Sequence, residues 1–199
     1  MLNDKTTLSD LAVYTAEGDS VFQLIDHTTT QYGKEMLRRH IQHPPGSYEQ
    51  FTETQEVIRY WMYHAGQWPA IISNGTLVML DKFFEAADGA ATPPGKFNLL
   101  TGSWFQKLFN RNEYFFTQFS ISHLSDFLNG CLQLTDLLQQ EDLPVLLRRE
   151  LESMQGELAH RLTPAVVKVN KETSFKELSN ISYRARREMK HMVNRLMLH

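Results

Sequence analysis

Hydrophobic residues recur three and four positions apart along most of the chain, and long alternating patterns are scarce. This spacing is typical of amphipathic α-helices, so it predicts an all-α, multi-helix bundle. The only strand that we expect is a short one at Leu11–Tyr14. The predicted helices begin, in chain order, near Tyr32, Ser47, Gly75, Phe97, Ser122, Pro144, Thr163 and Ser174.

The boundary between the first two predicted helices is well marked. Pro44, Pro45 and Gly46 end the first helix, because proline lacks an N–H and disfavours helical geometry in the residue before it. Ser47 is the expected N-cap of the second helix and forms a capping box with Gln50. The apolar face that we expect this helix to bury consists of Phe51, Thr54, Ile58, Trp61 and Met62.

The middle of the chain contains a Gly- and Pro-rich segment, residues 88–95, that is a loop by composition and a candidate subdivision of the domain. An aromatic-rich stretch, Phe97–Phe119, follows and predicts one or two helices with a break near residues 110–112. Ser122 is the expected N-cap of the next helix, and Cys131 lies on the apolar stripe of that helix.

Three further segments complete the pattern. Pro144 opens a helix that runs through Leu158, and Thr163 and Pro164 restart the chain for a short segment. The last segment, Ser174–His199, predicts one long helix that no glycine or proline closes. Its expected apolar side carries Phe175, Leu178, Ile181, Met189, Met192, Val193 and Leu196.

The composition fits one globular domain or two small ones. The 199 residues are 42% hydrophobic and 22% charged, which excludes a disordered chain. A single cysteine excludes an internal disulfide and favours a reducing compartment. No apolar run approaches the length of a membrane span, so we expect a cytoplasmic protein with no membrane contact.

The formal charge of −3 is unevenly distributed. Residues 1–100 carry a net −5, whereas residues 168–199 carry eight cations and three glutamates, a net +5. Helical spacing places four basic residues of this last segment on one face, where they could contact DNA phosphates or a partner. The alternative is a face turned toward water or acidic residues. The four are Arg184, Arg187, His191 and Arg195.

The chain lacks the short motifs of common enzymes. It has no P-loop, no GxGxxG, no HExxH and no CxxC, and its eight histidines show no HxH spacing. Cys131 is expected to be a buried small hydrophobe. We therefore predict no catalytic, cofactor-binding or metal-binding residue. At least one of Arg38 and Arg39 is expected to form an internal ion pair, because adjacent helical residues cannot face the same way.

One stretch is more specific than any short motif. Val21–Pro44 reads VFQLIDHTTTQYGKEMLRRHIQHP and resembles the opening of the core (lever) domain of MutS-family DNA mismatch-repair proteins. Ser47–Trp61 resembles the helix that follows in that family. Lys34 and Glu35 stand where the family often has Ser and Arg. The residues at matching positions are Asp26, Thr28, Thr30, Gly33, Leu37, Arg38 and Pro44.

The physical chemistry of these residue types agrees with a structural role. Thr28 and Thr30 are able to cap or bridge a break between two helices, and Gly33 permits a close helix contact. Pro44 ends the second helix. We interpret the motif as a corner built from packing residues rather than from catalytic ones.

The resemblance implies a non-catalytic, all-helical core that couples DNA engagement to an ABC-type ATPase through a long lever helix. Residues 1–199 would form this core, and a C-terminal ATPase domain beyond residue 199 would bind ATP and Mg²⁺. The full-length protein is expected to contact DNA and to form a homodimer. We expect no mismatch-reading domain before Leu11, and the pattern of residues 95–170 does not match the family's DNA clamp.

Two other functions stay open at this point. The first is a free-standing helical protein-interaction domain that uses exposed aromatic residues. The second is direct binding of the DNA backbone by the basic face of residues 184–195. The aromatic candidates for the interaction domain are Trp104, Phe105, Tyr114 and Phe115.

Overall fold

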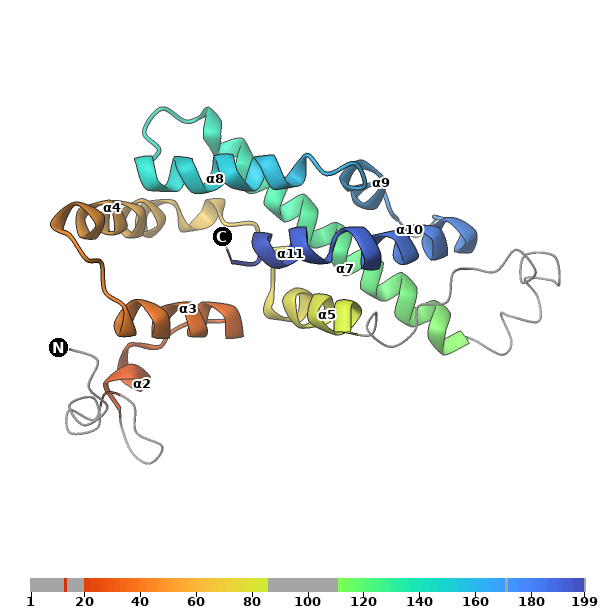
Figure 1. Ribbon diagram of the computed structural model, residues 1–199, viewed down its shortest axis with the longest axis horizontal. Helices are drawn as coiled ribbons and strands as arrows, with labels where there is room; N and C mark the ends of the chain where they lie inside the picture. Colours follow the sequence, from red (N-terminus) through yellow and green to blue (C-terminus); the bar gives the residue numbers. More distant parts are fainter. Residues whose placement is uncertain (1–12, 14–19, 86–110, 171, 199) are drawn as a thin grey trace. The chain divides into compact units, whose positions relative to one another are not determined.

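The computed structural model describes residue 13 and residues 20–85, 111–170 and 172–198. All regular structure in these ranges is helical, which confirms the all-α class (Figure 1). The α-helices are α2 (Val21–Ile25), α3 (Gln31–Gln42), α4 (Tyr48–His64), α5 (Asn74–Glu85), α7 (Arg111–Thr135), α8 (Val145–Leu158), α9 (Thr163–Val167), α10 (Phe175–Glu188) and α11 (Lys190–Leu196), and the 3₁₀-helices are η1 (Ala65–Gln67) and η2 (Asp136–Gln139).

The chain forms two compact units, one up to Arg59 and one from Tyr60 onward, so the boundary falls inside α4. The loop expected at residues 88–95 and the aromatic segment up to residue 110 lie outside the described residues. The same holds for the expected strand apart from Val13, whose carbonyl accepts a hydrogen bond of 3.2 Å from the Phe22 N–H.

Side-chain hydrogen bonds cap the start of α2, which was not predicted, and the start of α4. The Ser20 hydroxyl accepts from the Gln23 N–H (3.1 Å), while the Gln23 side chain accepts from the Ser20 N–H (3.0 Å), so a capping box starts α2. Ser47 caps α4 by accepting from the Gln50 N–H at 3.2 Å. The Gln50 side chain accepts from the Gly46 N–H at 3.0 Å. The predicted capping box would need the Ser47 N–H instead, so only its Ser47 half is formed.

The second unit is built around α7. Helix α7 runs from Arg111 to Thr135 without interruption, so the predicted N-cap at Ser122 is wrong. Ser122 is an exposed residue in mid-helix, because the residues on either side of it, Ile121 and Leu124, are fully buried and hold the helix against the core. The helix is followed by η2, where Leu137 is buried.

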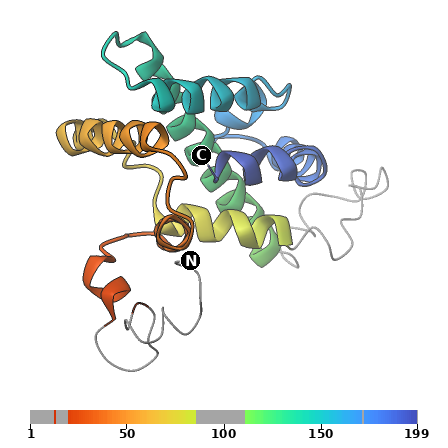
Figure 2. The ribbon, with the colours of Figure 1, turned by 60° about the vertical axis from the view of Figure 1, so that its left-hand side comes forward.

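Helices α5, α8, α9 and α10 all contact α7, and Figure 2 shows α5, α8 and α10 arranged around it. Their apolar stripes match the predicted spacing and form one core with α7. The buried side chains are Leu77, Leu80, Phe83 and Phe84 on α5, Ile121, Leu124, Phe127, Leu128, Cys131 and Leu134 on α7, and Leu147, Leu151, Met154 and Leu158 on α8.

The connection between α7 and α8 is held by polar contacts. The Arg148 guanidinium donates to the carbonyls of Leu138 (3.1 Å) and Gln140 (2.7 Å). The Tyr60 hydroxyl donates to the Gln140 side chain (2.7 Å) and is also bonded to the Gln67 side chain (3.1 Å). The two Arg148 bonds satisfy backbone carbonyl groups at the end of η2 that the helix leaves without partners.

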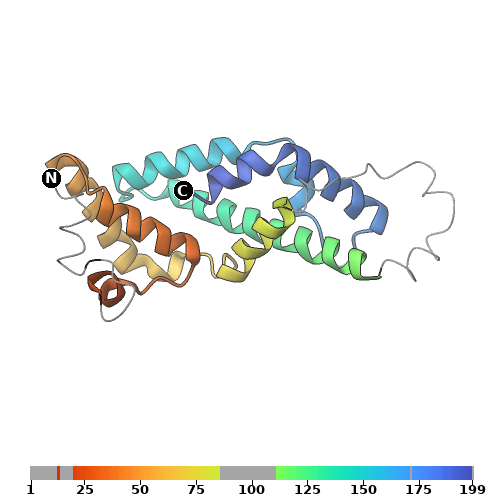
Figure 3. The ribbon, with the colours of Figure 1, turned by 60° about the horizontal axis from the view of Figure 1, so that its bottom comes forward.

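The C-terminal segment is two helices rather than the single long helix that was expected. The break falls at Met189, yet the Met189 N–H still bonds to the Ala185 carbonyl and the Val193 N–H to the Met189 carbonyl, each at 2.9 Å. Helix α10 contacts α7 and α11 contacts α8, as Figure 3 also shows. The bend at buried Met189 lets one apolar seam follow both helices.

The composition of that seam also differs from the prediction. Phe175 is 41% exposed, and Ile181 is only partly buried. The small side chains of Ser182 and Ala185 are buried in their place, because small residues let α10 lie close to its neighbours. Within the described residues, the last helix, α11, ends at Leu196.

Candidate functional site

The motif residues that carry the resemblance form a hydrogen-bonded corner between α2 and α3. The Asp26 carboxylate accepts from the hydroxyl of Thr28 (2.6 Å) and from its N–H (3.2 Å). Its second oxygen lies 2.8 Å from Lys34 Nζ. Thr30 caps α3 by accepting from the Gly33 N–H at 2.9 Å. We call these residues, Asp26, Thr28, Thr30, Gly33 and Lys34, the corner.

The electrostatics of the corner favour an ionised aspartate. The hydrogen bonds from Lys34 and Thr28 lower the pKa of Asp26 from 3.8 to about 2. Lys34 is one of the two positions at which the sequence departs from the family pattern. In this chain it supplies the cation that the motif aspartate binds.

Gly33 makes a close contact, although with the corner itself rather than with another helix. A Cβ at this position would lie 3.0 Å from Thr30 Oγ1 and 3.6 Å from Thr28 Cβ. Any larger residue would therefore press on the two threonines that shape the turn. This explains physically why the motif has glycine here.

The remaining motif residues bracket α3. Arg38 places its guanidinium over the Phe22 ring at 5.1 Å from the centroid, and the Lys34 ammonium lies 5.8 Å from the same centroid. Leu37 is partly buried. Pro44 follows the last hydrogen bond of the helix, from the His43 N–H to the Arg39 carbonyl, and ends α3 as predicted.

The prediction that α4 buries its apolar face is wrong, because most of that face is exposed. Phe51 is 47% exposed, Ile58 55% and Met62 73%, whereas the buried residue of α4 is Tyr60. The helical period was right, but exposure depends on what lies against the stripe. Among the described residues of the first unit, the buried side chains are Phe22 and Ser20. Apolar residues of α2 are also exposed, with Leu24 at 67%.

The predicted basic face is divided by internal ion pairs. Arg195 forms two hydrogen bonds of 2.6 Å to the two carboxylate oxygens of Glu157 on α8. This bond to Glu157 raises the pKa of Arg195. Arg195 is thus held by α8, whereas His191 is exposed to solvent. The four residues do not act as one uniform basic surface.

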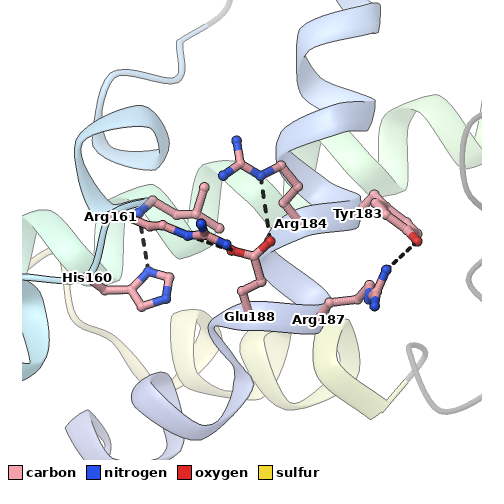
Figure 4. Close-up of polar contacts among 7 residues, drawn as sticks. His160, Arg161, Tyr183, Arg184, Arg187 and Glu188 are labelled. Carbon is pink, nitrogen blue, oxygen red and sulfur yellow. Dashed lines mark hydrogen bonds and ion pairs between the residues drawn. The ribbon is translucent and has the colours of Figure 1, made fainter.

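Arg184 lies beside a second carboxylate, Glu188, which also binds Arg161 (Figure 4). Arg161 donates to Glu188 Oε2 from Nε (3.1 Å) and from Nη2 (2.6 Å), and Arg184 Nε lies 3.7 Å from Oε1. Arg187 donates instead to the Tyr183 hydroxyl at 2.8 Å. The hydrogen bond from Arg161 is the largest cause of the lowered pKa of Glu188.

Sequence reasoning missed Arg161, Glu188 and Glu157 as members of this surface. Arg161 and Glu188 are separated by 27 positions, and Glu157 and Arg195 by 38. Only the packing of α8, α9, α10 and α11 brings these pairs together. Helical periodicity within one segment carries no signal for such contacts.

Two observations concern candidate metal ligands and nucleophiles. Within them, no three His, Cys, Asp or Glu side chains are grouped as metal ligands. Cys131 is buried on α7 as predicted, and burial raises its thiol pKa to about 12. A thiol with so high a pKa is a poor nucleophile.

No protein-family model, curated protein or solved structure matches this chain. Among the helices of the described ranges, none has the length and apolar character needed to cross a membrane.

Proposed function

We propose that this chain is a non-catalytic helical core/lever domain of a MutS-like DNA repair ATPase. In the complete protein it would couple DNA engagement to ATP binding and hydrolysis, with ATP and Mg²⁺ bound in a separate ATPase domain. The complete protein would contact DNA and act as a homodimer. The observation that carries the proposal is the corner, since residues of the family-like stretch make its hydrogen bonds and its ion pair.

A corner of this kind suits mechanical coupling. A coupling element has to move as a rigid body, so that a displacement at one site reaches the other without being absorbed locally. The Thr30 cap fixes the start of α3, and the Asp26–Lys34 pair ties the segment after α2 to the first turn of α3. Both contacts restrict the angle between the two helices.

The experiment uses the complete natural protein that contains this chain. ATP hydrolysis is measured with and without duplex DNA, for the wild type and for Asp26→Asn. We expect DNA-dependent hydrolysis in the wild type and a smaller ratio of stimulated to basal rate in the variant. Glu35→Gln is the matched control, because its exposed carboxylate accepts only from the Gln31 side chain of the same helix (3.1 Å) among the contacts described. A protein that binds no ATP would refute the proposal.

A helical protein-interaction domain is the second candidate. The observation that favours it is the exposure of apolar side chains on α2 and α4, including Leu24 (67%) and Ile58 (55%). Of the aromatic residues expected to serve this function, Phe115 is 53% exposed on α7. The side chains of Trp104, Phe105 and Tyr114 lie outside the described part of the chain.

The two candidates give opposite results in one set of measurements. If the chain is an interaction domain, the complete protein should not hydrolyse ATP. Its association with itself or with another protein, measured by sedimentation, should be lost in Ile58→Ser. The lever domain predicts ATP hydrolysis whose DNA stimulation is sensitive to Asp26→Asn.

A further inference from the structure

Glu188 holds two arginines from separate segments side by side (Figure 4). Arg161, between α8 and α9, donates twice to one of its oxygens, at 3.1 and 2.6 Å. Arg184, one turn earlier on α10, lies 3.7 Å from the other oxygen. Arg187 follows on the same helix. We call Arg161, Arg184, Arg187 and Glu188 the Glu188 cluster.

The cluster has an excess of positive charge that remains open to solvent. The cluster holds three arginines and one carboxylate, which leaves a net charge of about +2 because arginine stays protonated at neutral pH. The side chain of Arg161 is 72% exposed and that of Arg184 is 42% exposed, against 29% for Glu188. Glu188 therefore pairs with the arginines without covering them.

Arg187 is oriented by a neighbour rather than by the carboxylate. Its Nη1 donates to the Tyr183 hydroxyl at 2.8 Å, and its guanidinium lies 5.5 Å from the centroid of that ring. A guanidinium offers five N–H donors, so one bond to Tyr183 leaves most of them for a ligand. The same count applies to Arg161, which uses two donors on Glu188.

We propose that the Glu188 cluster binds the phosphate backbone of DNA, with Arg161, Arg184 and Arg187 as the phosphate ligands. This inference rests on the proposed function and assigns to it a surface for DNA contact. Guanidinium groups bind phosphate oxygens through paired hydrogen bonds, which makes arginine the preferred residue for this ligand. The contact is to the backbone and carries no sequence specificity.

The arrangement favours a phosphate chain over an acidic protein surface. Arg184 and Arg187 lie three positions apart on α10, about 4.5 Å along the helix axis, and Arg161 reaches the Glu188 carboxylate from another segment. Phosphates along one DNA strand recur about every 3.4 Å of axis, so arginines at this spacing are able to meet neighbouring phosphates of one strand. Carboxylates on a protein surface have no such regular row.

Arg195 is excluded from this surface, which distinguishes the Glu188 cluster from the basic face that helical spacing predicts. Both oxygens of Glu157 are bonded to Arg195, each at 2.6 Å. Arg161 takes its place, although it lies outside the C-terminal segment whose helical spacing predicts the basic face. The site therefore depends on two chain segments that are brought together by folding.

The test measures binding of the 199-residue chain to a fluorescein-labelled DNA duplex by anisotropy at several salt concentrations. We expect salt-dependent binding in the wild type. Arg161→Ala and Arg187→Ala each reduce the slope of log affinity against log salt by about 0.9, the value for one lost phosphate contact. Arg149→Ala, an exposed arginine on α8, and Arg195→Ala leave the slope unchanged.

Glu188→Gln separates ligand binding from a structural role. Removing this carboxylate removes a competitor of phosphate, so the variant should bind DNA more tightly than the wild type while Arg161→Ala binds more weakly. Equal weakening by both variants would show that the pair is only a brace and would overturn the proposal. Thermal unfolding of each variant, followed by circular dichroism, verifies that it is folded.

Three further outcomes also overturn it. The first is an absence of DNA binding at 50 mM salt, and the second is equal slopes for Arg161→Ala and Arg149→Ala. The third is binding of labelled poly-glutamate but not of DNA, which would identify an acidic protein as the partner. None of these results bears on ATP hydrolysis by the complete protein, so failure of this inference is distinct from failure of the proposed function.

Discussion

Asp26 Oδ2 and Lys34 Nζ lie 2.8 Å apart, and this ion pair joins the segment after α2 to the first turn of α3. The aspartate matches the family pattern and the lysine departs from it. The departure therefore adds a contact to the corner instead of weakening it. The same carboxylate accepts two hydrogen bonds from Thr28, so every strong partner that it has in the described structure favours its ionised form.

The first prediction concerns the titration of Asp26. Its pKa is lowered from 3.8 to about 2 in the folded chain, so folding favours the carboxylate. The stability that this provides is fully present above pH 3.8 and is lost as the pH falls toward 2. Carbon-detected NMR titration of the side chain should show a midpoint near 2. A midpoint at the ordinary value would contradict the geometry of the corner.

Lys34→Gln is the control for this titration. The bond from Lys34 is the largest cause of the low pKa, so the variant should move the midpoint of Asp26 back toward 3.8. The Thr28 bonds remain and should keep part of the shift. A midpoint that does not move in the variant would show that Lys34 has no part in it.

The second prediction concerns Tyr60, whose hydroxyl donates to Gln140 at 2.7 Å and is bonded to Gln67 at 3.1 Å. Tyr60→Phe removes this hydroxyl and leaves the ring. The loss should lower the free energy of unfolding by about 1 kcal/mol, the usual net contribution of a hydrogen bond. Urea unfolding measures the change, and Tyr63→Phe is the matched control because Tyr63 is 84% exposed. Equal midpoints for the two variants would count against the network.

The helices were predictable where their signals are local. Thr30, Ser47 and Pro44 mark boundaries within a few residues of themselves, and the stripes on α5 and α8 carry the correct period. The break at Met189 was not predictable, because methionine is not a residue type that marks a helix end. Helix α10 contacts α7, whereas α11 contacts α8.

The candidate sites also differ in whether their contacts are local in the sequence or arise from folding. The corner lies within nine residues of sequence, Asp26 to Lys34, so a local motif contained nearly all of it. The Glu188 cluster needs Arg161, 27 positions away, and the basic face was therefore predicted with Arg195 in its place. Exposure on α4 was also mispredicted, since periodicity identifies a stripe but not the surface that covers it.

The third prediction uses Cys131, the single cysteine of the chain. It is 1% exposed, and burial raises its thiol pKa to about 12. Thiolate is the reactive species, so the folded protein should react with a disulfide reagent such as DTNB far more slowly than a free thiol at pH 8. The protein in 8 M urea provides the control and should react at the rate of an exposed thiol. Equal rates in the two conditions would show that the α7 core opens readily.

The fourth prediction compares two helical glycines with opposite surroundings. A Cβ at Gly130 on α7 would lie 2.5 Å from Ile72 Cγ1 and 3.0 Å from Ile71 Cγ2, whereas a Cβ at Gly156 on α8 would meet no atom within 4 Å. Alanine is favoured over glycine in a helix by about 1 kcal/mol, so Gly156→Ala should be stabilising by up to that amount. In Gly130→Ala the same gain is opposed by overpacking, which typically costs about 1–3 kcal/mol.

The net effect of Gly130→Ala should be destabilising, because Ile72 Cγ1 is attached to a branched Cβ and is not the far end of a flexible side chain, so relief of the clash requires a change of χ1 or a shift of the segment before α5. Denaturant unfolding of the two variants gives the sign of each change. We expect the free energy of unfolding to fall in Gly130→Ala and to rise in Gly156→Ala. If both substitutions are stabilising, α7 does not approach Ile72 as closely as the structure has it.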